Sequence, residues 1–85
     1  PIITNAHTHL ELTGLAHICP SQPVDFINWI GKVAWRRRWR RISQIQADIA
    51  LGIEELRACG TTNVGDITAT WMSVEPLLAS GLRGV

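Results

Sequence analysis

Residues 43–67 constrain the fold more than any other part of this chain. Ser43 followed by Gln46 three positions later is the pattern of a capping box, which predicts the start of a helix. Gly60 stands where many helices end on a left-handed glycine, and residues 61–67 then form a strand pattern. Between these signals, apolar and small residues recur at helical spacing, namely Ile45, Ile49, Gly52, Ile53, Leu56 and Cys59.

The remaining segments repeat this alternation of strand and helix. Residues 1–6 predict a short buried strand, and residues 13–23, rich in glycine and proline, predict a loop. A helix is expected from Ser21 or Pro23 to about Arg41, with a buried apolar stripe formed by Phe26, Ile27, Ile30, Val33 and Ala34. Ser73 should cap a short helix that ends at Gly81, before a last strand. Strands separated by helices predict an α/β fold with a parallel sheet.

Two histidines end the first predicted strand, in the sequence Asn-Ala-His-Thr-His-Leu-Glu-Leu. On an extended strand, His7 and His9 project from the same face at a spacing of about 6.7 Å. They are therefore close enough to share one metal ion, and imidazole nitrogen is a preferred ligand of zinc and iron. A polar strand end without a metal is the alternative interpretation of a short H-x-H pattern.

This motif resembles the first-strand motif of the metal-dependent amidohydrolase superfamily. Residues 52–66 are similar to the segment of that superfamily that leads from a helix into the second strand, and residues 77–85 to the entry into the third. The resemblance implies a fragment of a (β/α)8 TIM barrel, with strands 1 to 3 and the intervening helices in residues 1–85. It also implies that His7 and His9 bind a divalent metal, zinc or alternatively iron, and that further ligands come from later strands.

The resemblance also implies a function. A metal-activated water would attack a carbon–nitrogen bond other than a peptide bond, in a small-molecule substrate. The motif is similar to amidohydrolases of the aminodeoxyfutalosine deaminase type, which implies deamination of a nucleoside or heterocycle, with Glu11 contacting the sugar. Glu11 could instead be an exposed loop carboxylate or a helix-capping partner. For Asp66, at the end of the second predicted strand, we expect a structural role in orienting a loop rather than a place in the site. His17, in the predicted loop, is expected to contact only water.

Five arginines, at positions 36, 37, 38, 40 and 41, surround Trp39. Arginines with an interleaved aromatic residue could bind nucleic acid. We favour a solvated helix end whose cations offset the helix dipole, with the tryptophans packed underneath, because three basic residues stand against seven acidic ones in the rest of the chain. A nucleic-acid partner is therefore not expected.

The length, 85 residues, is far below the roughly 250 residues of a complete barrel. Both ends of the chain look cut, so an inactive fragment is a further alternative. Cys19 and Cys59 lack metal-ligand spacing, and we expect reduced thiols, with Cys59 buried, in a cytoplasmic protein. No apolar run approaches the length of a transmembrane helix, so no membrane partner is expected. The oligomeric state is left open.

Overall fold

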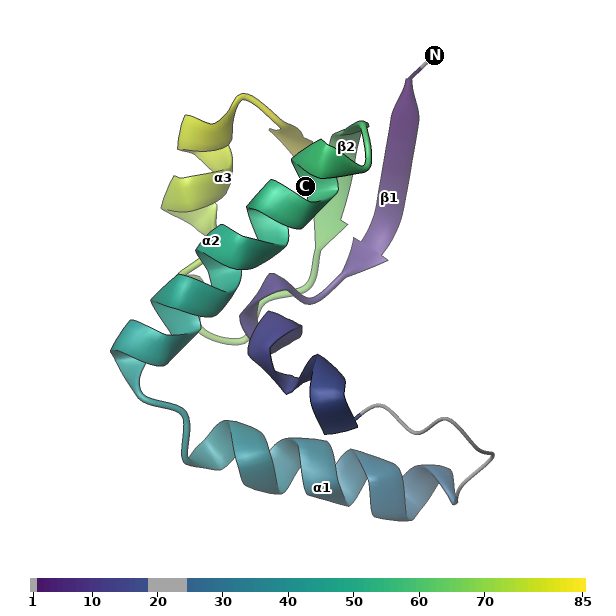
Figure 1. Cartoon of the computed structure of the whole chain (residues 1–85), viewed down its shortest axis with the longest axis vertical. Helices are drawn as coiled ribbons and strands as arrows, with labels where there is room; N and C mark the ends of the chain where they lie inside the picture. The colour runs from purple at the N-terminus through teal and green to yellow at the C-terminus, as the bar shows by residue number, and fades with distance from the viewer. Residues whose placement is uncertain (1, 19–24) are drawn as a thin grey trace.

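The computed structural model describes residues 2–18 and 25–85, in which strands and helices alternate (Figure 1). The elements follow one another as β1 (Ile3–Thr8), the 3-10 helix η1 (Leu10–Ile18), α1 (Phe26–Arg38), α2 (Ile42–Ala58), β2 (Thr61–Asp66), α3 (Val74–Ser80) and β3 (Arg83–Gly84). The predicted order of strands and helices from residue 42 onward is confirmed.

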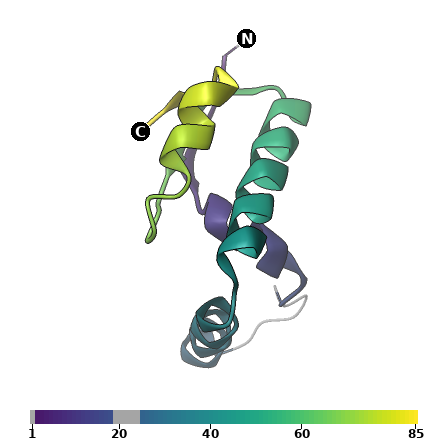
Figure 2. The same ribbon diagram turned by 90° about the vertical axis from the view of Figure 1, so that its left-hand side faces the viewer.

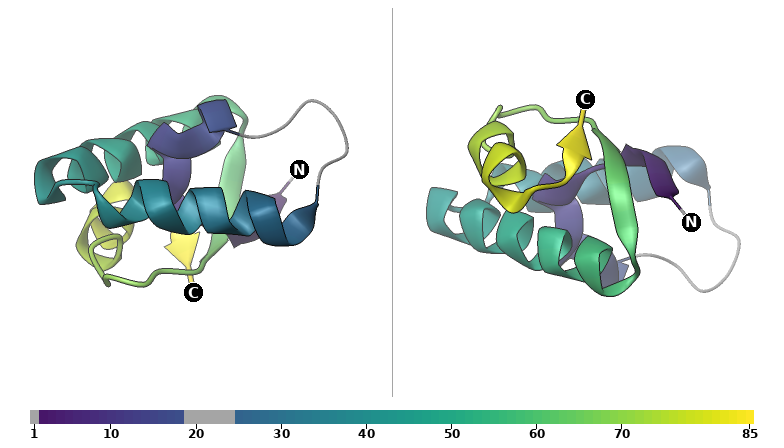
Figure 3. Two further views of the ribbon diagram at one scale, coloured as in Figure 1. Left: turned by 90° about the horizontal axis from the view of Figure 1, so that it is seen from below. Right: turned by 90° about the horizontal axis from the view of Figure 1, so that it is seen from above.

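The three strands form one parallel sheet in the order β1-β2-β3, which confirms the α/β class. Helices α2 and α3 contact each other and lie on the same side of this sheet (Figures 2 and 3). This is the result of right-handed crossovers between neighbouring parallel strands. The opposite side is open: Thr4, Ala6, Asn63 and Gly65 line a hollow of about 600 Å³ there.

The core lies between α2, α3 and the start of η1. Leu10, Ile49, Ile53 and Leu77 are buried together, and Ile45, Leu56, Met72 and Leu82 pack around them. The apolar stripe predicted for α2 is therefore confirmed over most of its length. Cys59 is an exception, because it caps the helix as an exposed free thiol instead of lying in the core.

The residue types at helix ends predicted the position of most of these ends to within one or two residues. Gly60 and Gly81 have φ angles of 77° and 81°, as expected of glycines that end helices. The predicted capping box was wrong, because α2 begins at Ile42 and the side chain of Gln44 accepts the Arg41 N–H at 2.8 Å. Ser73 precedes α3 as predicted, but its hydroxyl donates to Asp66 and accepts no hydrogen bond from the helix N–H groups.

The first part of the chain departs further from the predictions. The loop predicted from Thr13 is wrong up to Ile18, because η1 folds directly after His9 and packs against α2. Strand β1 is not buried on both faces, since one face of the sheet is uncovered and Ile3 is 44% exposed. Cys19, the helix start predicted at Ser21 or Pro23, and the side chain of His17 lie outside the described residues.

Helix α1 contradicts the predicted apolar stripe. Asp25 caps it by accepting the Ile27 N–H at 3.0 Å, but none of its residues is buried, and Phe26 and Ile27 are 64% and 73% exposed. The helix lies across the end of the molecule and contacts mainly η1 (Figure 1). No helix in residues 2–18 and 25–85 is long and apolar enough to cross a lipid bilayer.

Candidate metal centre

The two histidines meet where β1 ends. The pairing of β1 with β2 is irregular between Asn5 and Thr8, and the Asn5 side chain accepts the His7 N–H at 3.2 Å. The Nε2 atoms of His7 and His9 lie 3.1 Å apart, with the ring centroids 5.0 Å apart and the rings inclined at 64°. The structure thus brings together the two side chains that the H-x-H spacing places on one face.

His9 is also held from its other ring nitrogen. Its Nδ1 lies 3.2 Å from the carbonyl oxygen of Ile67, directly after β2, and the Ile67 N–H donates to the Thr8 carbonyl at 2.8 Å. An Nδ1–H that donates to a backbone carbonyl selects the tautomer with a lone pair on Nε2. The Nε2 atom of His9, which lies nearest His7, is therefore the one suited to bind a metal.

The separation of the two nitrogens agrees with one shared ion. Two imidazoles on a tetrahedral zinc, with bonds of about 2.0–2.1 Å, hold their nitrogens about 3.3 Å apart. The 3.1 Å between His7 and His9 is within a few tenths of an ångström of that value. Two ligands do not complete a zinc site, and within the described residues no group of three or more His, Cys, Asp or Glu side chains lies together. The pair therefore has the geometry of two ligands but not of a complete site.

Glu11 is buried, at 5% exposure, so the exposed-loop interpretation of this residue was wrong. Its carboxylate holds the loop that follows β2. The hydroxyls of Thr68 and Thr70 both donate to Oε1, the latter at 2.7 Å, and the backbone N–H groups of Thr70 and Ala69 donate at 3.1 and 3.3 Å. Arg37 adds a cation, with Nη2 3.7 Å from Oε2. Glu11 thus ties η1, α1 and the loop after β2 together beside His9.

These contacts change the acidity of Glu11. Burial by itself raises the pKa of the carboxyl group, but the hydrogen bonds from Thr68, Thr70 and Ala69 favour the charged form and outweigh burial. The pKa of Glu11 therefore lies below the ordinary glutamate value, and the group is a carboxylate at neutral pH.

Asp66 has the structural role expected from the sequence. One carboxylate oxygen accepts the Leu10 N–H at 3.0 Å, and the other accepts the hydroxyl of Ser73. Asp66 therefore links the start of η1 and the start of α3 to the end of β2, and it keeps the loop between β2 and α3 in place.

Space for a ligand lies beside the histidine pair. A small cavity of about 120 Å³ is lined by His9, Glu11, Arg37, Ile67 and Thr68, among others. A larger apolar groove of about 400 Å³ runs from His9 between η1 and α1. Arg37, Thr68 and Thr70 are neighbours of Glu11 that the sequence alone does not indicate. No local pattern could have done so, because the threonines lie more than fifty positions away along the chain.

Comparisons of this chain with protein-family models, with curated proteins and with solved structures found no match. The geometry of the site and the sequence pattern therefore carry the functional argument.

Proposed function

We propose that this chain supplies two metal ligands, His7 and His9, to a metal-dependent hydrolase that acts on a carbon–nitrogen bond other than a peptide bond. The observation that carries the proposal is the convergence of the two Nε2 atoms at 3.1 Å, with His9 held through Nδ1 by the Ile67 carbonyl. Zinc is the metal best suited to such a pair, and iron is the alternative. The substrate class proposed is a nucleoside or heterocycle that is deaminated, in line with the amidohydrolase resemblance of the motif.

The arrangement of the sheet supports a barrel as the parent fold. Strands in the order β1-β2-β3, with α2 and α3 on one side, are what consecutive units of a (β/α)8 barrel would form. His7, at the carboxyl end of β1, and Asp66, at that of β2, lie at the edge where barrel enzymes build their active sites. We therefore propose that the open side of the sheet is the inner side of such a barrel.

Each residue of the site then has a definable task. A bound divalent ion would lower the pKa of a coordinated water and so supply hydroxide near neutral pH. His7 and His9 would hold the ion, and the Ile67 carbonyl would orient His9. Glu11 lines the cavity next to His9, so its carboxylate is the group placed to accept a hydrogen bond from a substrate hydroxyl. Arg37 holds its guanidinium group 3.7 Å from the Glu11 carboxylate and borders the same cavity.

A titration with Co²⁺ and Zn²⁺ tests the histidine pair without an assay of activity. We expect one equivalent of metal to bind the 85-residue chain weakly, with changes in the NMR signals of His7 and His9, because two ligands form only part of a site. Binding should weaken at acidic pH, since protons then compete with the metal ion for the imidazole nitrogens.

The matched variants are His7→Ala and His9→Ala, with His17→Ala as the control that removes the third histidine of the chain. Each of the first two should abolish binding, and the control should leave it unchanged. Equal binding by all three variants would show that the pair is no metal site, and the proposal would be wrong. A cytoplasmic location belongs to the same proposal, supported by the free thiol of Cys59.

A further inference from the structure

The run of arginines after Trp35 divides into two sets by the direction of the side chains. Arg37 lies 3.7 Å from Glu11, and Arg40 forms an ion pair with Asp48, so both are turned toward the body of the molecule. Lys32, Arg36 and Arg38 of α1 form no ion pair with any carboxylate in the described part of the chain. The same holds for Arg41, which lies beyond α1 as the N-cap of α2. Residues 26–41 carry six basic and no acidic side chains, so these three cations have no counter-charge on their own segment.

The three free cations surround two exposed indole rings. Trp35 and Trp39, one helical turn apart, are 57% and 65% exposed, and their ring centroids lie 5.8 Å apart at 70°. The guanidinium group of Arg38 lies 6.0 Å from the centre of the Trp39 ring. The expectation that the tryptophans pack beneath the arginines is therefore wrong for both Trp35 and Trp39.

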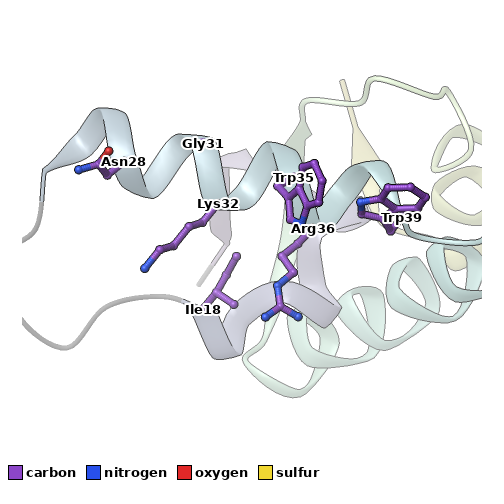
Figure 4. A pocket seen from close by; sticks show the side chains of 7 residues that line it. All are labelled: Ile18, Asn28, Gly31, Lys32, Trp35, Arg36 and Trp39. Carbon is purple, nitrogen blue, oxygen red and sulfur yellow. The ribbon is translucent and has the colours of Figure 1, made fainter.

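A groove of about 880 Å³ runs along this face of α1, lined by Gly31, Lys32, Trp35, Arg36 and Trp39 together with Ile18 of η1. Figure 4 shows Lys32 and Arg36 extending from one side of the helix toward Ile18, with Trp35 and Trp39 following one another along it. Gly31 carries no side chain one turn before Trp35, which leaves the approach to the first ring open.

The order of side chains around the helix indicates which partner fits. With about 3.6 residues per turn, Trp35 and Trp39 fall between Arg38 on one flank and Lys32 and Arg36 on the other. A helix that lies on a membrane separates its apolar and cationic residues onto opposite faces, whereas here cations flank the two aromatic rings on both sides of one face. Exposed aromatic rings with cations at their sides are the arrangement that binds single-stranded nucleic acid, where bases stack on the rings and phosphates meet the cations.

We propose that the outer face of α1, formed by Lys32, Trp35, Arg36, Arg38 and Trp39, binds single-stranded nucleic acid. Trp35 and Trp39 stack with bases, and the three cations neutralise phosphates of the same strand. The sequence alone favoured a solvated helix end over a nucleic-acid partner, because acidic residues outnumber basic ones in the rest of the chain. The exposure of Trp35 and Trp39 is the observation that changes this preference. The proposal is independent of the metal site, since none of these five residues lines the cavity beside His9.

Fluorescence anisotropy of a labelled oligouridylate or oligothymidylate of about 15 nucleotides, titrated with the 85-residue chain, tests the proposal. We expect the logarithm of the binding constant to fall with the logarithm of salt concentration at a slope of about −2, as three neutralised phosphates predict. Trp35→Ala and Trp39→Ala should each weaken binding about tenfold. Trp71→Ala is the matched control, because Trp71 is 75% exposed but lies in the loop after β2, and it should have no effect.

A second pair of variants distinguishes binding at this face of α1 from non-specific attraction of the nucleic acid to any basic side chain. Arg36→Gln with Arg38→Gln should lower both the affinity and the salt slope, whereas Arg57→Gln with Arg83→Gln, which removes two arginines elsewhere, should change neither. Circular dichroism confirms that each variant keeps its helices. Equal binding of a duplex of the same length, stronger binding to anionic lipid vesicles or polyglutamate, or equal loss in all five variant proteins would overturn the proposal.

Discussion

Glu11 is the side chain that holds the loop after β2 in place beside the histidine pair. It lies two residues after His9, and its carboxylate receives hydrogen bonds from Thr68, Ala69 and Thr70. Because the same loop begins at Ile67, which contacts His9 Nδ1, a change at Glu11 should also affect the orientation of the histidine. A buried carboxylate that receives several donors is stabilising only as long as it remains charged.

Replacement of Glu11 by glutamine should therefore lower the free energy of unfolding by about 1–3 kcal/mol at pH 7. Since the pKa of Glu11 is lower in the folded chain than its ordinary value, the charged group stabilises the fold fully above about pH 5. This stabilisation is lost as the pH falls through the folded pKa. The difference between the two proteins should then shrink below about pH 4 in urea titrations followed by circular dichroism.

Glu55→Gln is the control, because Glu55 is an exposed residue of α2 whose carboxylate forms no hydrogen bond or ion pair with residues 2–18 or 25–85. It should leave the stability within about 0.5 kcal/mol of the original protein. A Glu11→Gln protein that is as stable as this control would show that the loop does not depend on the carboxylate.

At the scale of single residues, the side-chain placements that could be predicted were those between residues close together in the sequence. The meeting of His7 and His9 follows from the period of a strand, and the structural role of Asp66 from its place at a strand end. The partners of Glu11 could not be predicted, because they are brought to it by the pairing of β1 with β2. The exposure of Trp35 and Trp39 depends on where α1 docks, which helical spacing does not determine.

At the scale of elements, the approach of β1 to β2 depends on one glycine. A Cβ atom on Gly65 would lie 2.6 Å from the carbonyl oxygen of Ala6, and backbone cannot move aside as a flexible side chain can. Gly52 has a similar role between α2 and η1, where a Cβ atom would meet the Thr13 hydroxyl oxygen at 2.5 Å.

Gly65→Ala should lower the free energy of unfolding by about 1–3 kcal/mol, because the strands must move apart. Gly31→Ala provides the opposite case, since no atom lies within 4 Å of its added Cβ and the position is inside a helix. It should raise the stability by up to about 1 kcal/mol. Urea unfolding followed by circular dichroism measures both, and equal effects at the two positions would contradict the strand contact.

The elements from α2 to β3 could be predicted because each carries its own local signals, namely an apolar stripe, a terminal glycine and a short extended run. Helix η1 could not, because glycine and proline after residue 13 indicate a loop, and the packing of Leu10 and Leu15 against the rest of the protein overrides that signal. Helix α1 was predicted as a helix but not as an exposed one. An apolar stripe shows that a helix needs a partner and does not say where that partner lies.

At the scale of the whole molecule, the described residues leave much apolar surface uncovered. The core is small, one face of the sheet is open, and β1 and β3 each have a neighbouring strand on one side only. Unpaired strand edges are sites at which further chains can add. We therefore expect the 85-residue chain to associate with itself as its concentration rises.

Sedimentation velocity over a range of concentrations tests this expectation. Ile2→Lys, at a 78% exposed position beside the β1 edge, should reduce association, because an edge lysine opposes strand addition. Leu78→Lys changes a residue of equal exposure, 79%, on α3, and should have a smaller effect. A chain that stays monomeric at every concentration would show that the edges are protected.

The exposure of α1 also has a consequence for spectroscopy. Three of the four tryptophans, Trp29, Trp35 and Trp39, belong to α1 and its C-terminal cap, and the fourth, Trp71, is in an exposed loop. None of them lies in the core of Leu10, Ile49, Ile53 and Leu77. Trp29 is half-buried, but the other three rings are exposed, so indole emission should come mainly from rings in water and should shift little when the core melts. The same emission is well placed to report any molecule that settles on the outer face of α1.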